Sequence, residues 1–171
     1  MTTTIYTIGY EGTDIERFIQ TLKAVGVKVL ADVRAVALSR KTGFSKTALR
    51  SRLEMEGIAY IHFMELGDPK TGREAARAGK YDKFRQIYSK HLATADAQVA
   101  LASLRDTVKN SPTCLLCFER DPIVCHRSII TQKLKTSGVK ILDLFGDNPA
   151  RYDNLTTKLP RYHPRESAAA A

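Results

Sequence analysis

The segment 117–128, CFERDPIVCHRS, combines two thiols, two carboxylates, two guanidinium groups and one imidazole. It begins at the end of an apolar run that is typical of a buried β-strand. Side chains of these types can transfer protons, hold anions or bind a metal ion. The segment is therefore a candidate reaction centre, metal site or polar surface turn.

Sequence spacing argues against a metal site. Cys114 and Cys117 lie on the same predicted strand, three positions apart, so their side chains point to opposite faces of the sheet. Cys125 and His126 are adjacent, and in a helix they would project about 100° apart, which suits a shared ion poorly. We predict no metal site and no bound cofactor.

Acid–base and anion-binding groups are easier to assign. Glu119 follows an apolar strand, where burial would raise the pKa of its carboxyl group, and we expect it to act as acid, base or nucleophile. His126 would transfer a proton or orient Glu119. A helix that opens at Asp121–Pro122 would place Arg127 and free amides at an anion. Alternatively, His126 and Arg127 only bond to Glu119 or Asp121 and fix the turn.

Polar residues also follow other predicted strands. Gly9 and Tyr10 follow the first, and Asp32 and Arg34 follow the second. If the sheet is parallel, these residues meet segment 117–128 at one edge, where Asp32 and Arg34 would position a sugar or base. The pair could instead be an ordinary ion pair. The first glycine loop lacks the three-glycine spacing of dinucleotide-binding proteins, so NAD is not indicated.

The loop 39–45, SRKTGFS, mixes hydroxyls, cations and one aromatic ring. Ser39 and Arg40 could contact phosphate, and Phe44 could stack on a base. Burial of Phe44 in the core explains the pattern about as well. We assign Gly9, Tyr10 and Cys125 with these residues to the binding site. The catalytic group consists of Glu119, His126, Asp32 and Cys117.

These residues need a scaffold that brings strand ends together. The sequence predicts strands over 5–8, 27–33, 58–63, 113–118 and 139–144. Helices are predicted from a cap at Thr13 to Val25, from a cap at Ser45 to about 56, and over 81–92, 96–108 and 123–136. Alternation of this kind predicts a three-layer Rossmann-like α/β domain, with a mainly parallel sheet and helices on both faces. We expect one domain over 1–146 and an irregular tail over 147–171.

The 171 residues carry 27 Lys and Arg against 18 Asp and Glu, a net charge of +9. A basic surface of this kind attracts polyanions or phosphorylated ligands, although it can also serve solubility alone. No apolar stretch is long enough for a membrane span, and the start lacks the pattern of a signal peptide. With three cysteines, an odd number, reduced thiols are expected, and we predict a cytoplasmic protein.

Four motifs in order, TIGYEG, ADVRAVALSRKTGFS, IAYIHFMELG and LLCFERDPIVCHR, resemble the DUF488 family of small α/β proteins over about residues 7–143. The sequence departs from the family pattern at Ala37, where proline is usual. The resemblance implies the fold and a shared edge but no activity. It marks the following positions as belonging to the family pattern: Gly9, Asp32, Arg34, Ser39, Arg40, Phe44, Leu66, Gly67, Cys117, Glu119, Cys125, His126 and Arg127.

Three functional hypotheses follow. The first is an enzyme that acts on a nucleotide, or on a base or sugar-phosphate of nucleic acid, with Glu119 as the reacting carboxylate. The second is a non-catalytic nucleic-acid-binding module that uses the loop 39–45 and the basic region 70–90. The third is a thiol nucleophile or redox site at Cys117. The expected partner is a phosphorylated small molecule or a nucleic acid, with no membrane.

Overall fold

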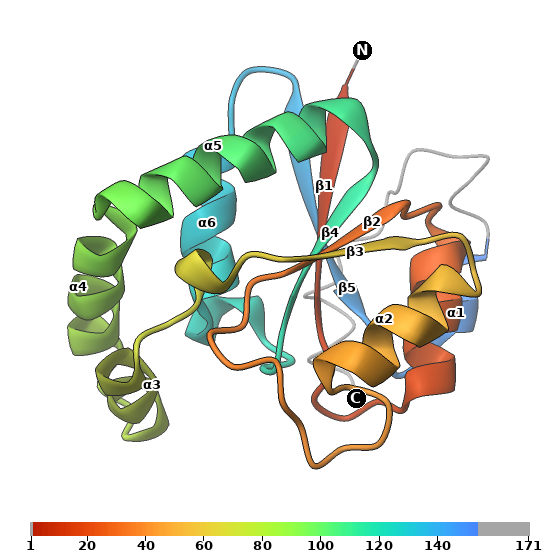
Figure 1. The fold of residues 1–171 in the computed structure, drawn as a ribbon, viewed down its shortest axis with the longest axis horizontal. Coiled ribbons are helices and arrows are strands. Elements are labelled where there is room, and N and C mark those ends of the chain that lie inside the picture. The colour runs from red at the N-terminus through yellow and green to blue at the C-terminus, as the bar shows by residue number, and fades with distance from the viewer. Residues whose placement is uncertain (1, 154–171) are drawn as a thin grey trace.

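Five parallel strands form a single sheet in the computed structural model, which describes residues 2–153 (Figure 1). The strands are β1 (Thr3–Gly9), β2 (Val29–Asp32), β3 (Ala59–His62), β4 (Thr113–Cys117) and β5 (Val139–Phe145). Their order across the sheet is β3-β2-β4-β1-β5. The predicted three-layer α/β class is confirmed, and the sheet is parallel throughout.

One face of the sheet is covered by α1 (Ile15–Ala24), α2 (Lys46–Glu54) and the short 3₁₀ helix η3 (Pro149–Tyr152). Apolar side chains from these elements pack against the strands as one buried cluster, which includes Phe18, Leu22, Leu49, Leu53 and Tyr152. Tyr152 belongs to the segment that was predicted to be an irregular tail. The remainder of that tail, residues 154–171, lies outside the described residues.

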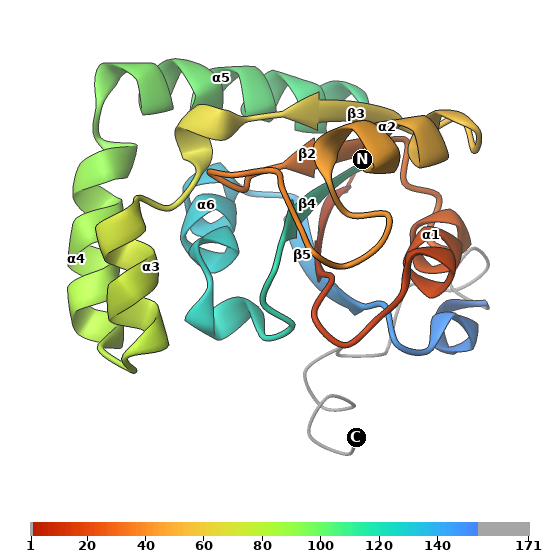
Figure 2. The same cartoon turned by 60° about the horizontal axis from the view of Figure 1, so that its bottom comes forward.

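The other face is covered by α5 (Ala95–Asn110) and α6 (His126–Leu134), and α4 (Tyr81–Leu92) packs beyond them at the side of the domain (Figures 1 and 2). Their buried cluster includes Tyr88, Leu101, Leu104, Ile130 and Leu134. Helix α3 (Lys70–Arg77), which the sequence did not predict, lies along α4 at the side of the domain (Figures 1 and 2). The 3₁₀ helix η1 (Met64–Leu66) leads from β3 toward it.

Two helices begin later than predicted. Asp14, not Thr13, caps α1 by accepting a hydrogen bond from Arg17 N, while the Thr13 hydroxyl bonds to the carbonyl of Gly146. Residues Pro122–Val124 form a separate 3₁₀ turn, η2, and Cys125 is extended (φ −128°, ψ 151°). Helix α6 therefore begins at His126, three residues beyond the predicted start.

The neighbouring strands β1 and β4 send the chain in opposite directions. The chain leaves β1 through α1 toward β2, whereas it leaves β4 through α6 toward β5. In open parallel sheets a crevice forms at the carboxyl ends of two such strands, and ligands bind there.

Within residues 2–153, no helix is both long and apolar enough to cross a membrane.

Candidate functional site

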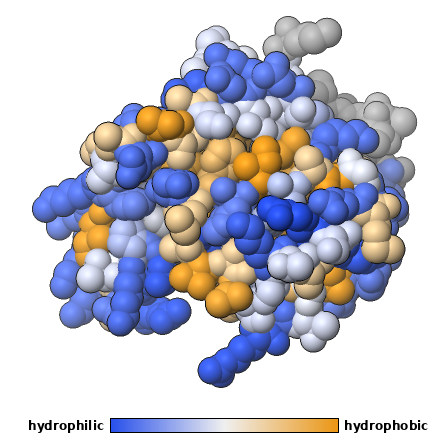
Figure 3. All heavy atoms as spheres, in the orientation of Figure 1, coloured by the Kyte–Doolittle hydropathy of each residue, from blue (hydrophilic) through white to orange (hydrophobic). Residues whose placement is uncertain are grey.

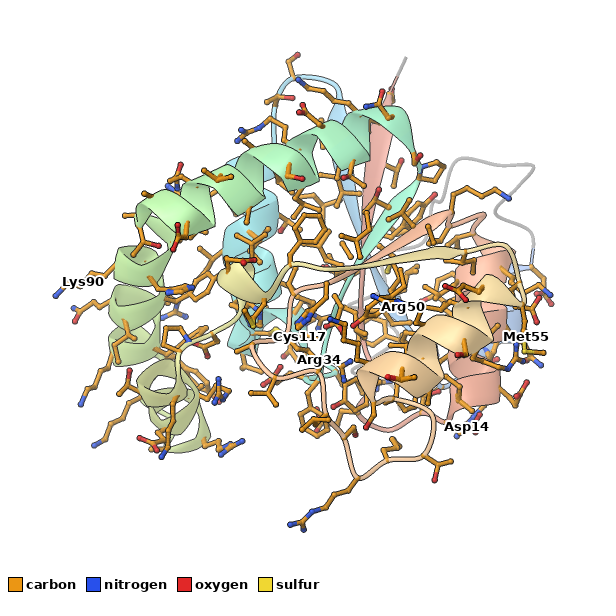
Figure 4. All side chains as sticks on the ribbon, viewed as in Figure 1. Asp14, Arg34, Arg50, Met55, Lys90 and Cys117 are labelled. Atoms are coloured by element: carbon orange, nitrogen blue, oxygen red, sulfur yellow. A yellow bond between two sulfur atoms is a disulfide. The ribbon has the colours of Figure 1, made fainter. Side chains whose placement is uncertain are left out.

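A pocket of about 610 Å³ opens at the carboxyl edge of the sheet. Arg34 and Cys117, both of which line it, lie together near the middle of the molecule below the sheet (Figure 4). On the face shown in Figure 3, separate orange hydrophobic patches are set among blue hydrophilic side chains. The charged and sulfur-containing or imidazole side chains in the pocket wall are Glu11, Arg34, Arg40, Asp68, Arg73, Arg77, Cys117, Glu119 and His126.

Arg34 is held in the pocket wall by a buried carboxylate. Asp32 is fully buried and accepts two side-chain hydrogen bonds from Arg34, from Nε at 2.9 Å and from Nη2 at 2.7 Å. The hydroxyl of Tyr60 donates to the same carboxylate, and Arg34 Nη1 donates to Phe44 O. Burial alone would lower the pKa of Arg34, but the bonds and charge of Asp32 raise it. Asp32 does not line the pocket, so it positions Arg34.

Gly9 allows the ends of β1 and β4 to approach closely. A Cβ atom at position 9 would overlap the carbonyl of Glu119. The next two amides donate to β4 and its extension, from Tyr10 N to Cys117 O and from Glu11 N to Phe118 O. Gly9 therefore places Glu119 but offers no side chain to a ligand.

Two carboxyl groups face the pocket, one from Asp68, which is buried, and one from Glu119, which is half-buried. Burial raises the pKa of Glu119, and it raises the pKa of Asp68 to about 7. Asp68 Oδ1 has no hydrogen-bond partner within the described residues. Asp68 was not predicted as a site residue, although it directly follows the Leu66–Gly67 motif near a strand end.

Three arginines in the wall form no ion pair within residues 2–153. Arg73 and Arg77 come from α3, and Arg40 comes from the loop after β2. Arg73 donates to the backbone carbonyl of Asp68. The two α3 arginines were missed because α3 itself was missed; the cations that alternate with small residues in KTGREAAR were the available signal.

Arg127 does not reach the pocket. Its side chain is 0% exposed, and Nη2 donates to Glu119 O at 2.6 Å and to Arg120 O at 3.4 Å. Its Nε and Nη1 atoms have no partner within the described residues, and burial lowers its pKa. Arg127 is therefore not placed to contact an anion in the pocket; as the alternative expectation had it, Arg127 fixes the turn, here through the backbone carbonyls of Glu119 and Arg120.

Phe44 also belongs to the core. It is fully buried, stacks on Tyr10 with ring centroids 4.6 Å apart, and packs edge-on to Phe18. Of the two roles predicted for Phe44, base stacking and burial in the core, the structure shows burial. Phe118 is the exposed aromatic ring of the pocket: it is 48% exposed, lines the pocket and meets Tyr10 edge-on at 5.2 Å.

Ser39 lines the pocket, but its polar groups take part in the loop structure. Ser39 Oγ accepts from Lys41 N, and the Ser45 hydroxyl donates to Ser39 O. Arg40, which is next in the chain, is exposed and faces the pocket. The loop therefore presents a cation at a fixed place.

A cluster of three buried side chains with sulfur or imidazole groups lies at the pocket wall: Cys117, Cys125 and His126. His126 Nε2 lies 2.7 Å from Val33 O, and burial lowers the pKa of this imidazole to about 4. The sulfur atoms of Cys117 and Cys125 are in disulfide contact, yet their Cα atoms are 7.7 Å apart, beyond the usual 4.4–6.8 Å. Cys117 Sγ also lies 2.7 Å from Glu119 Oε2, where only a thiol can donate. The thiol forms fit the backbone better.

A family model described as "Domain of unknown function DUF488" matches residues 14–134. The match covers helices α1 to α6 and strands β2 to β4, including Arg34, Glu119 and the residues around Cys125. No curated protein and no solved structure matches the chain. The family model spans more than half of the sequence, and the chain therefore belongs to the DUF488 family.

Proposed function

We propose that the protein is an enzyme that binds a nucleotide, or a base or sugar-phosphate of a nucleic acid, in the pocket at the carboxyl edge of the sheet. One observation carries this proposal. Arg40, Arg73 and Arg77 face the pocket without ion-pair partners in residues 2–153, beside the exposed ring of Phe118 and the carboxyl group of Glu119. This combination suits a ligand with a phosphate, an aromatic base and a bond to be broken.

Each group has a defined part. The three arginines bind phosphate oxygens, since guanidinium groups donate paired hydrogen bonds to them. Phe118 stacks on a base, with Tyr10 supporting its ring. Arg34, which Asp32 orients, contacts the sugar or base. Glu119 is the acid, base or nucleophile in cleavage or transfer at a glycosidic bond.

A non-catalytic nucleic-acid-binding module is the second candidate. It is favoured by exposed cations on and between α3 and α4, namely Lys70, Arg77, Lys80, Lys83 and Lys90. The half-buried Glu119 and the buried Asp68 have no evident use in binding a nucleic-acid backbone, which is why the enzyme ranks first. A module predicts affinity that falls steeply with salt, by roughly 0.7–0.9 in log affinity per log unit of salt for each phosphate neutralised.

Turnover assays with Glu119→Gln test the enzyme proposal. Nucleotides, nucleosides, sugar phosphates and short oligonucleotides are incubated with the protein, and products are separated by chromatography. Wild type should convert one of these classes, and Glu119→Gln should abolish turnover while binding is kept, because the amide fills the same space without proton exchange. Glu54→Gln, on the exposed side of α2, is the matched control and should remain active.

Two results would contradict the proposal. Undiminished turnover in Glu119→Gln would remove that carboxyl group from the mechanism. Absence of turnover in every class, together with salt-sensitive binding of oligonucleotides only, would favour the binding module. In either case, retention of the fold in the variant should be checked by circular dichroism.

A further inference from the structure

Three potential ligands of a soft metal ion meet in the pocket wall. The sulfur atoms of Cys117 and Cys125 and one ring nitrogen of His126 all lie within 4.8 Å of one another, and all three residues are buried. We propose that Cys117 Sγ, Cys125 Sγ and His126 Nδ1 bind a thiophilic divalent cation such as Zn²⁺. Two thiolates and one imidazole favour zinc over calcium or magnesium, which prefer oxygen ligands.

The imidazole is oriented as a ligand would be. Val33 O can only accept a hydrogen bond, so Nε2 of His126, 2.7 Å away, carries the proton. Nδ1 then has a free lone pair, and it lies 3.6 Å from Cys125 Sγ. In metal sites the second ring nitrogen of a histidine almost always donates to a carbonyl or carboxylate, which fixes the tautomer.

Cys125 sits where a thiolate is stabilised. It is the N-cap residue of α6, a helix of nine residues, and its sulfur accepts a hydrogen bond from Arg127 N at 3.5 Å. The positive end of the helix dipole favours the ionised thiol at this position. The hydrogen bond from Arg127 N to Cys125 Sγ is independent of the hydrogen bond that orients His126. Together they leave the Cys125 sulfur and His126 Nδ1 near each other, with lone pairs available for a metal ion.

Charge and spacing also fit an ion. Two thiolates balance the charge of Zn²⁺, so the buried cluster becomes neutral. Zinc–sulfur bonds of about 2.3 Å at a tetrahedral angle hold two sulfurs about 3.8 Å apart. The two sulfur atoms are in disulfide contact in the structure, so metal binding requires the reduced pair to move apart to this spacing. The 7.7 Å between the Cα atoms of Cys117 and Cys125, which is long for a disulfide, leaves room for that separation.

The extended backbone at Cys125 explains why sequence spacing argued against this site. If Cys125 and His126 lay in one helix, their adjacent side chains would diverge. Cys125 instead precedes the helix with φ −128° and ψ 151°, so its side chain can turn back toward His126 Nδ1.

An ion held by three protein ligands would have one position open toward the pocket, because Cys117, His126 and Glu119 all line it. Three protein ligands and an open position are typical of catalytic zinc sites, whereas structural sites are closed by four. Once Cys117 is a bound thiolate it no longer donates to Glu119, and the Glu119 carboxyl group beside it in the pocket wall is then available to hydrogen-bond to a water at that position. The inference goes beyond the proposed function, and its test needs no substrate.

The test measures metal binding by the reduced, full-length protein. The protein is stripped with a chelator under reducing conditions and titrated with Zn²⁺, and separately with Co²⁺ as a spectroscopic probe. We expect about one ion per chain, together with a thiolate-to-cobalt charge-transfer band and the intense visible bands of tetrahedral cobalt. Spectra of the wild type need no variant, so misfolding of a variant cannot obscure this result.

Cysteine variants then locate the ion. Cys125→Ala should weaken Zn²⁺ binding by more than the 10–100-fold that loss of a ligand's hydrogen-bond partner typically costs. Cys114→Ala is the matched control: Cys114 is buried on the same strand as Cys117 but belongs to the cluster on the opposite face, and the variant should bind normally. Circular dichroism checks the fold of both.

Three results would overturn the proposal. They are a folded, reduced wild type that takes up no stoichiometric Zn²⁺, a cobalt spectrum without a thiolate band, and equal affinity in Cys125→Ala and wild type.

Discussion

Asp32→Asn should strongly destabilise the protein. Asp32 is fully buried, and its carboxylate accepts hydrogen bonds from the backbone N, Nε and Nη2 of Arg34 and from the hydroxyl of Tyr60. Asparagine keeps the size but removes the charge, and it turns an NH₂ donor toward Arg34, whose N–H groups only donate. Arg34 would then be a buried cation with no partner charge.

The expected loss is about 3–5 kcal/mol, which is typical when one partner of a buried ion pair is removed. Domains of this size have unfolding free energies of about 5–15 kcal/mol, so the variant could lose a large part of its stability. Asp82→Asn is the matched control. Asp82 also pairs with an arginine, Arg85 at 2.9 Å, but its side chain is 99% exposed, and we expect no measurable change.

Urea unfolding measures both variants. The sequence has no tryptophan, so far-UV circular dichroism is the appropriate signal. Tyr60→Phe should fall between the two variants, because it removes one hydrogen bond to a charged group, worth about 1.5–3 kcal/mol. If Asp32→Asn changed stability as little as Asp82→Asn, Asp32 would not be the residue that holds Arg34 in place.

Three further predictions concern the core and the pocket. Phe44→Ala should lower the free energy of unfolding in urea by about 3–5 kcal/mol, because Phe44 is a buried core residue. Phe118→Ala should leave the stability nearly unchanged and weaken nucleotide binding. Similar losses of stability in the two variants would contradict the assignment of Phe44 to the core and Phe118 to the pocket. Gly9→Ala should destabilise the protein by about 1–3 kcal/mol and impair ligand binding, because the added methyl group pushes Glu119 away. Normal ligand binding in this variant would show that the close approach of Gly9 to Glu119 is not needed for the site. Asp68 holds its proton up to about pH 7 in the folded protein but releases it near pH 4 when unfolded, so the stability of the wild type should fall as pH rises between these values. Asp68→Asn should remove this dependence and be more stable than the wild type by about 1–2 kcal/mol at about pH 8. Parallel pH profiles of stability for the two proteins would refute this role of Asp68.

Much of the fold was predictable because its signals are local. The helix over 81–92 was placed at its observed bounds, since Phe84 and Tyr88 recur at helical spacing and are buried. Helix α3 escaped prediction because its buried positions are Gly72 and Ala75, which give almost no hydrophobic signal. Gly72 is small for a tertiary reason: a Cβ there would overlap the side chain of Asp68.

The sequence predicted at which strand ends the candidate site lies, but it did not predict the directions of all the side chains there. Parallel strands bring Arg34, Cys117 and Glu119 to one edge, and this follows from the alternation of elements. The directions of Arg127 and Phe44 depend on where α6 begins and on how the loop 39–45 folds against β1. Those are long-range properties, and sequence spacing carries little information about them.

The most direct test of the account is ligand-induced thermal stabilisation of wild type, Arg77→Ala and Lys90→Ala at low and high salt. Arg77 lines the pocket, and Lys90 lies on the outer side of α4, so each variant removes one cation from a different place (Figure 4). A ligand that binds only the native state raises the unfolding temperature by mass action. We predict salt-resistant stabilisation by a nucleotide or sugar phosphate in wild type and Lys90→Ala, and its loss in Arg77→Ala. Stabilisation by oligonucleotides alone, abolished by salt and equal in both variants, would contradict a selective pocket.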